Sequence, residues 1–219
     1  MQMERIWIIG GGRFGLQAAQ KLLQKKPATD ITVIEQDANI CNQLKKQPFK
    51  SVCMDGITYL SENLKASDGP DWIVPAIPVH VAYEWIRIKL TGRYLFEPLA
   101  VPEGVARTLP NTVQGAGGEC YISNADFICP EDCPEPYETC THTGKPRLRI
   151  LHRALKAIQH NNFYSIVIKS RQLGRGIGGY SPEALFKALN EIMISDTFIL
   201  LSTACRCHGV MHAFKISKY

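Results

Sequence analysis

Apolar residues along the first 90 positions follow two periods, which alternate along the chain. Short apolar runs predict four strands, at 5–9, 31–34, 51–53 and 71–74. Helical spacing between and after these runs predicts helices at 14–23, 56–64 and 81–88. Alternation at Ile86, Ile88 and Leu90 would also suit a strand in the last of these segments. Strands and helices in this order predict an α/β fold with a mostly parallel sheet.

The pattern changes between residues 91 and 146. Proline and glycine are frequent there, apolar periodicity is weak, and the segment holds four of the eight cysteines. These features predict an irregular, cross-linked insertion. Regular structure is expected again as a helix from Leu148 to Ile158, a strand at 163–168, a helix at 181–192 and a strand at 197–201.

Composition narrows the class of protein. The 219 residues are 45% hydrophobic and 21% charged, with a net charge of +5, which is typical of a globular chain with a real core. Apolar runs are far shorter than the roughly 20 residues that a membrane span needs, so no membrane insertion is expected. A strand-like segment begins almost at the first residue, where a secretory signal would stand. We therefore expect a cytoplasmic protein, in which cysteines are metal ligands, redox thiols or buried residues more often than disulfides.

Charges are segregated in the second half of the chain. Residues 119–138 contain six acidic side chains and no Lys or Arg, whereas residues 139–182 contain eight basic side chains and no acid. One interpretation is a pair of solvated faces that attract each other, and the other is a basic site for an anionic ligand. Basic residues interleaved with aromatic ones are missing, which argues against a nucleic-acid partner.

A nucleotide-binding motif follows the first predicted strand. Gly10, Gly12 and Gly15 satisfy G-x-G-x-x-G at the start of a predicted helix, and Glu35 closes the next strand. In this motif the glycines allow a tight turn, a close approach of backbone to pyrophosphate, and close helix packing, while the acid binds the ribose hydroxyls. No arginine stands beside Glu35 to accept a 2′-phosphate, so the sequence predicts NAD rather than NADP. The alternatives are a domain that has lost its ligand or one that binds another adenosine compound. The predicted cofactor-binding residues are Gly10, Gly12, Arg13, Phe14, Gly15 and Glu35.

The first 90 residues resemble a known family of domains. The stretches Ile8–Gly15 and Val33–Asp37 and the pair Asp55-Gly56 are similar to the glycine loop, ribose acid and third-strand turn of bacterial potassium-uptake regulators, the RCK or TrkA-N type. This resemblance implies a Rossmann domain that binds NAD. It does not extend to the cysteine-rich part. We therefore expect three parts: a dinucleotide-binding Rossmann half at 1–92, an irregular cysteine-rich insertion at 93–146, and a second α/β portion at 147–219 that completes the sheet or packs on it.

Two groups of cysteines are candidate metal ligands. Cys120, Cys129, Cys133 and Cys140 lie within 21 residues, and four thiolates can hold zinc or an iron–sulfur cluster. Their spacing matches no standard zinc or ferredoxin pattern, so iron–sulfur, zinc and unligated thiols all stay open. Cys205, Cys207 and His208 follow the last predicted strand and form a weaker second candidate, the alternative being small buried residues. His212 would pair with His208 only on a helix, whereas Cys41 and Cys53 are expected in the core.

Two further candidates have less support. A second glycine-rich loop carries Arg171, Gly174, Arg175 and Gly176 between a strand and a capped helix, where its backbone is a candidate anion site; the alternatives are a flexible lid or a plain connection. His80 stands near the carboxyl end of the fourth strand, with Glu84 four residues later, and is a candidate acid or base; the alternative is a surface side chain.

Together these features predict an NAD(H)-binding protein with a cysteine-ligated metal or iron–sulfur centre and a redox role, which makes an NAD-dependent oxidoreductase one candidate. Its partner would be a small anionic substrate or an electron-transfer protein, and a homodimer is compatible with the sequence. The main alternative is a non-catalytic, NAD(H)-sensing regulatory subunit with a structural zinc site.

Overall fold

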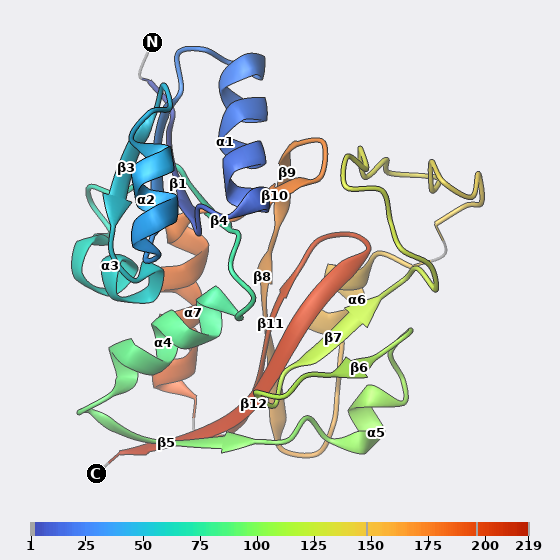
Figure 1. Cartoon of the computed structure of the whole chain (residues 1–219). Helices are drawn as coiled ribbons and strands as arrows, with labels where there is room; N and C mark the ends of the chain where they lie inside the picture. Colours follow the sequence, from blue (N-terminus) through green and yellow to red (C-terminus); the bar gives the residue numbers. More distant parts are fainter. Residues whose placement is uncertain (1–2, 148, 196, 219) are drawn as a thin grey trace.

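The computed structural model describes residues 3–147, 149–195 and 197–218 (Figure 1). Leu148, the first apolar residue of the predicted helix at 148–158, lies outside these ranges. Among the described residues, no helix combines the length and the apolar composition that a membrane crossing requires.

The first part of the chain is a four-stranded parallel sheet covered by helices, as the sequence predicts. Its strands follow the order β3-β2-β1-β4, and all neighbours are parallel. The elements are β1 (Arg5–Ile9), α1 (Arg13–Lys25), β2 (Asp30–Glu35), α2 (Ala38–Leu44), β3 (Lys50–Cys53), α3 (Gly56–Asn63), β4 (Trp72–Pro75) and α4 (Val81–Leu90). The segment after Pro78 is thus a helix and not a strand. This α/β arrangement is Rossmann-like, with β1 flanked by β2 and β4 and every carboxyl end at one edge.

The second part builds a separate mixed sheet. Its strands follow the order β6-β7-β12-β11-β8, and β5 also pairs with β12. The elements are β5 (Tyr94–Leu99), α5 (Glu103–Ala106), β6 (Val113–Gln114), β7 (Cys120–Ser123), α6 (Leu151–Lys156), β8 (Phe163–Lys169), β9 (Arg171–Gly174), β10 (Ile177–Gly179), α7 (Pro182–Ile194), β11 (Phe198–Ala204) and β12 (His208–Lys218). The long strand β12 is the common partner of β5, β7 and β11.

Two sequence predictions are wrong in this part. Residues 94–123 are not irregular, because β5 and β7 find antiparallel partners on β12, about a hundred residues later. The irregular segment is shorter, and we name residues 124–147 the cysteine loop. The second glycine-rich loop is also not an open loop: β9 and β10 pair as an antiparallel hairpin. His208 and His212 lie on strand β12, which removes the helical spacing that a metal pair would need.

One apolar core joins the two sheets. It includes Trp85 and Ile86 of α4, Leu185 of α7 and Phe214 of β12, all fully buried. Figure 1 shows α4 and α7 between the two sheets. The segment after β10 also reaches the first sheet, because the backbone of Tyr180 exchanges two hydrogen bonds with Ile73 of β4. The second part therefore packs on the first sheet. Its residue Tyr180 adds an antiparallel bridge beside the edge strand β4.

Candidate functional site

The glycine loop between β1 and α1 has the close packing that its motif requires. Gly10 has a φ of +106°, and a Cβ atom there would lie 2.7 Å from the carbonyl oxygen of Ala76. A Cβ atom on Gly15 would collide with the carbonyl oxygen of Gly10. A Cβ atom on Gly12 would meet no atom of the described residues within 4 Å apart from its chain neighbours, so space is open at the position where this motif places a pyrophosphate.

The first turn of α1 is free to bind an anion. Gly12 is the N-cap, no side chain caps the helix, and the first turn carries no acid. The exposed side chains of Arg13 and Phe14 follow, with the Arg13 guanidinium 4.7 Å from the Phe14 ring centre. Uncapped N–H groups at a helix start are the donors that a phosphate group needs.

The Glu35 carboxylate is held at the end of β2 by backbone donors. Its Oε2 accepts the N–H of Gly11 at 2.7 Å, and its Oε1 accepts those of Gln36 and Asp37, both at 2.8 Å. A cavity of about 430 Å³ opens beside it at the carboxyl ends of the first sheet, lined by Gly10, Glu35, Asp55 and other residues. Its volume is within the usual range for small-molecule sites.

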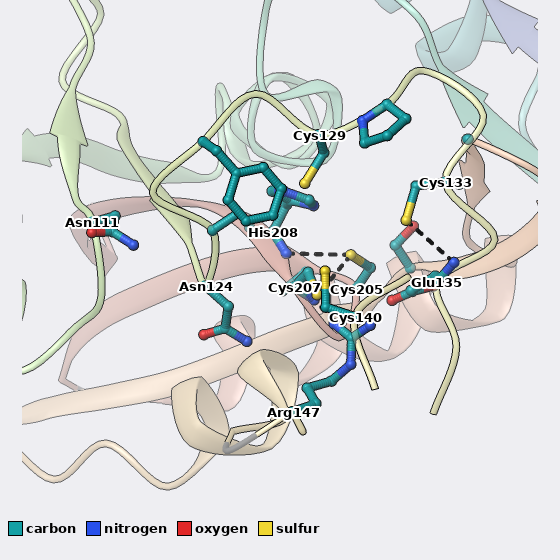
Figure 2. Close-up of a pocket in the computed structure, with 18 of the residues that line it drawn as sticks. Asn111, Asn124, Cys129, Cys133, Glu135, Cys140, Arg147, Cys205, Cys207 and His208 are labelled. Atoms are coloured by element: carbon teal, nitrogen blue, oxygen red, sulfur yellow. Dashed lines mark hydrogen bonds between the residues drawn. The ribbon is translucent and has the colours of Figure 1, made fainter. Parts of the chain in front are cut away.

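A second, larger cavity collects most of the free cysteines. It measures about 1280 Å³ and is lined by Cys129, Cys133 and Cys140 of the cysteine loop, and by Cys205 and Cys207 of the β11–β12 turn and His208 at the start of β12 (Figure 2). The two cysteine groups of the sequence analysis thus meet in space. Cys120 does not line this cavity: it is fully buried on β7, in the apolar cluster that includes Ile122, Leu151 and Met211.

Backbone N–H groups point at two of these sulfur atoms. The Cys205 sulfur accepts the N–H groups of Cys207 and His208, both at 3.3 Å, and the Cys133 sulfur accepts that of Glu135 at 3.4 Å. Hydrogen bonds from Thr143 and His142 lower the pKa of Cys140. Burial raises the pKa of Cys205 to about 12 and also raises that of Cys129.

Arg147, which the sequence analysis did not single out, lies at the edge of the cysteine cavity. It lines the same cavity as Cys129, Cys140 and Cys205, and its positive charge acts to lower the pKa of all three thiols. Its Nε atom is buried and, within residues 3–147, 149–195 and 197–218, has no hydrogen-bond partner. A buried N–H donor of this kind is costly unless an acceptor is supplied to it.

The cavity does not have the geometry of a site for a single metal ion. Within residues 3–147, 149–195 and 197–218, no three His, Cys, Asp or Glu side chains converge closely enough to hold one. The thiols instead surround an open space.

The β9–β10 hairpin supports the cysteine loop. Arg175 forms an ion pair with Asp132, with 3.3 Å between the charged atoms. The N–H of Gly176 and the side-chain amide of Gln172 both donate to the carbonyl oxygen of Cys133, at 3.0 and 2.6 Å. Of the residues predicted to bind an anion, Arg175 and Gly176 thus have partners within the chain.

The other two residues of the predicted anion site, Arg171 and Gly174, lie on β9. Arg171 lies over the Trp72 ring at 5.9 Å, and Gly174 ends β9. The contact between Arg175 and Asp132 favours the interpretation of two oppositely charged faces that attract each other.

His80 is buried rather than exposed. It is the N-cap residue of α4, with 5% of its surface accessible. Its Nδ1 lies 3.0 Å from Nδ1 of His212, and its Nε2 lies 2.8 Å from Oγ1 of Thr203. The Tyr83 ring stacks on His212 at 3.8 Å. Glu84 binds Arg87 instead of His80.

Cys41 and Cys53 are joined by a disulfide, with 5.7 Å between their Cα atoms. Cys41 is buried, as expected, but Cys53 is exposed, so the prediction that both lie in the core is wrong for Cys53. The bridge lies next to the proposed ribose acid, because Cys53 is paired with Glu35 in the β2–β3 register.

A third cavity, of about 420 Å³, lies between the other two. It shares Ile77 and Pro78 with the cavity beside Glu35, and it shares Phe14, Glu131 and the hairpin residues Gly176–Gly178 with the cysteine cavity. The ion pair between Arg13 and Glu131, at 2.6 Å, crosses this region and ties the glycine loop to the cysteine loop.

Comparison with known proteins also divides the chain into two parts, and it assigns α4 to the second of them. The TrkA-N domain model matches residues 6–61. A family model described as "Uncharacterized protein, C-terminal domain" matches residues 82–217. A protein of Archaeoglobus fulgidus with the name "Uncharacterized protein" is 30% identical over 223 residues, which cover 95% of this chain and 98% of the relative. The resemblance of the N-terminal part to TrkA-N domains is therefore confirmed.

Proposed function

This chain belongs to the family that the C-terminal domain model defines, with a TrkA-N domain in front of it, and on this premise we propose that it binds NAD(H) beside a cysteine-ligated centre. The TrkA-N match by itself indicates a nucleotide-binding domain of regulatory type. The main support for a dinucleotide is a combination of features at the glycine loop. Space is open at Gly12, no side chain caps α1, and the Glu35 carboxylate is held in place by backbone N–H groups.

The residues present fit the nucleotide. The pyrophosphate would rest on the N–H groups at the start of α1, and Arg13 stands beside them. The ribose hydroxyls would donate to Glu35, which is exposed to the cavity of about 430 Å³. A carboxylate at this position repels a 2′-phosphate, so the proposal specifies NAD(H) over NADP(H).

Calorimetric titration of the full chain with NADH and NADPH tests this. We expect NADH to bind more tightly than NADPH, and Glu35→Gln to weaken NADH binding by roughly 10- to 150-fold, since a hydrogen bond to a charged group contributes about 1.5–3 kcal/mol. Glu183→Gln, on the exposed first turn of α7, is the matched control and should bind NADH as the wild type does. Equal binding of both nucleotides, or no binding of NADH, would contradict the proposal.

We further propose that the cysteine cavity holds a metal or iron–sulfur centre and that the protein has a redox role in the cytoplasm. The support is the convergence of five thiols and His208 from two separate segments on one cavity. The centre would supply electron or Lewis-acid chemistry, while the chain supplies thiolate ligands and orients the nucleotide. A small anionic substrate or an electron-transfer protein would be the partner.

The second candidate is an NAD(H)-sensing regulatory subunit with a structural zinc site, and the TrkA-N match favours it. Turnover separates the two candidates. Oxidation of NADH with an artificial acceptor such as ferricyanide supports the redox role, whereas NADH binding without turnover, together with bound zinc, supports the regulatory one.

A further inference from the structure

The cysteine cavity is built from two walls that the chain fixes to each other. One wall is the cysteine loop, and the other is the turn between β11 and β12. Asn124 joins them through its backbone N–H, which donates to the carbonyl oxygen of Cys207 at 2.8 Å. Glu135 joins them again, because its carboxylate accepts the N–H of Arg206 at 2.5 Å and its carbonyl oxygen accepts the Arg206 guanidinium at 2.9 Å. The thiols of both walls are therefore held around one space.

The pattern of N–H groups around the sulfur atoms is the pattern that stabilises bound thiolates. Cys133 and Cys205 each accept an N–H from the residue two positions later, and Cys205 also accepts one from the residue three positions later. The pKa of Cys140 is lowered, chiefly by Thr143, in the same loop. A turn that aims N–H groups at sulfur compensates negative charge on a ligating thiolate and tunes a cluster held there.

The buried Nε of Arg147 is an independent observation that points to a ligand. This N–H has no acceptor among the described residues, although its guanidinium lies beside Cys140 in Figure 2. Four thiolates around a metal centre carry net negative charge, and cluster sulfides accept hydrogen bonds. A bound anionic centre in this cavity would balance the positive charge of Arg147 and would give its Nε–H group a hydrogen-bond acceptor.

The arrangement of the thiols around a cavity favours a cluster over a single ion. Tetrahedral zinc, with bonds of about 2.3 Å, needs its four sulfur atoms within about 4 Å of one another. No such convergence exists in the described parts of the chain, where the thiols instead line a cavity of about 1280 Å³. An iron–sulfur cluster occupies the space between its ligands, so it needs thiols arranged around a cavity.

From these contacts we propose that Cys129, Cys133, Cys140 and Cys205 hold a [4Fe–4S] cluster, with Arg147 as its charged hydrogen-bond donor. This assignment rests on the proposed function and makes its metal centre specific. It replaces Cys120 of the sequence-predicted set with Cys205. Cys207 supplies a backbone N–H to the site, and its thiol is not a ligand.

The test is to purify the full chain without oxygen, reconstitute it with ferrous iron and sulfide, and determine iron, acid-labile sulfide and the visible spectrum. We expect about four iron and about four sulfide per chain. Cys205→Ser should lose most of both, whereas Cys120→Ala and Cys207→Ser should keep them. Zinc without sulfide in the wild type, no metal uptake, or retention of the cluster by Cys205→Ser would overturn the assignment.

Two controls separate a lost cluster from a lost fold and from a failed nucleotide site. Each cysteine variant is titrated with NADH, and Glu35→Gln is analysed for iron. NADH binding without a cluster in the wild type refutes the cluster alone, whereas a cluster without NADH binding refutes the nucleotide site alone.

Arg147→Gln should keep the iron but lower the reduction potential of the cluster, because the cation stabilises the more negative, reduced state. Arg147→Lys should restore much of that potential. An unchanged potential in Arg147→Gln would refute the role of Arg147.

Discussion

The buried pair His80 and His212 makes the stability of this protein depend on pH. Their Nδ1 atoms lie 3.0 Å apart, so one of the two must donate a hydrogen and the other must accept it. Burial, followed by the charge of His212, lowers the pKa of His80 well below its usual value, and burial lowers the pKa of His212 as well. Protonating both rings would set two donors against each other in the core between the sheets.

The sign of the effect follows from the direction of these shifts. In the unfolded chain a histidine titrates near pH 6.5 and binds a proton below it, while the folded His80 stays neutral. The free energy of unfolding therefore falls as the pH drops below about 6.5. For a group that stays neutral in the fold, the loss between pH 7 and pH 5 is about 2 kcal/mol.

Urea unfolding at pH 7 and pH 5 measures this loss. His80→Gln removes the titrating group, so the variant should be less stable than the wild type at pH 7 but should lose about 2 kcal/mol less on acidification. His142→Gln, at an exposed position, is the matched control and should lose as much as the wild type. If His80→Gln lost the same amount as the wild type, the pair would not be the source of the dependence.

Three further predictions concern the glycine loop, the disulfide and the cysteine loop. Gly15→Ala should abolish NADH binding in calorimetry, because its Cβ atom would collide with the backbone of the loop. Cys53→Ser should lower the free energy of unfolding by roughly 3 kcal/mol in non-reducing urea titrations, with no difference under dithiothreitol, since it opens the bridge to Cys41. Arg175→Ala should change stability by less than about 1 kcal/mol but speed proteolysis of the cysteine loop, because its pair with Asp132 is exposed and anchors that loop.

The parts of the fold that depend on local contacts could be predicted from the sequence. The turn is specified by Gly10, because a glycine readily adopts its positive φ. The helix that starts at Arg13 is specified by apolar residues at helical spacing. The helix from Pro182 is likewise specified by Ser181, whose side chain accepts the N–H of Ala184. Each of these patterns involves only residues close together in the chain. The order β1, α1, β2 could therefore be predicted from the sequence.

The parts that depend on distant partners could not be predicted. Residues 94–99 are a strand because they pair with β12, and neither Pro98 nor their weak alternation indicates a sheet without that partner. The contact between His80 and His212 joins residues 132 positions apart, so His80 had no visible reason to be buried. Spacing alone also could not separate Cys120 from Cys205. The two cysteines differ in their surroundings, because Cys120 on β7 is buried in an apolar cluster whereas Cys205 lines the cysteine cavity.

The arrangement of the three cavities links the two proposed sites. A dinucleotide that rests on Gly12 with its adenosine beside Glu35 would extend its other half toward the third cavity, of about 420 Å³. Glu131 and the β9–β10 hairpin lie between this cavity and the cysteine cavity. The Arg13–Glu131 pair lies across this path. Nucleotide bound there would compete with Glu131 for Arg13, and Glu131 stands between two of the proposed ligands, Cys129 and Cys133, in the chain. Any effect of NADH on the centre then implies an equal effect of the centre on NADH affinity, because coupling between binding sites is reciprocal.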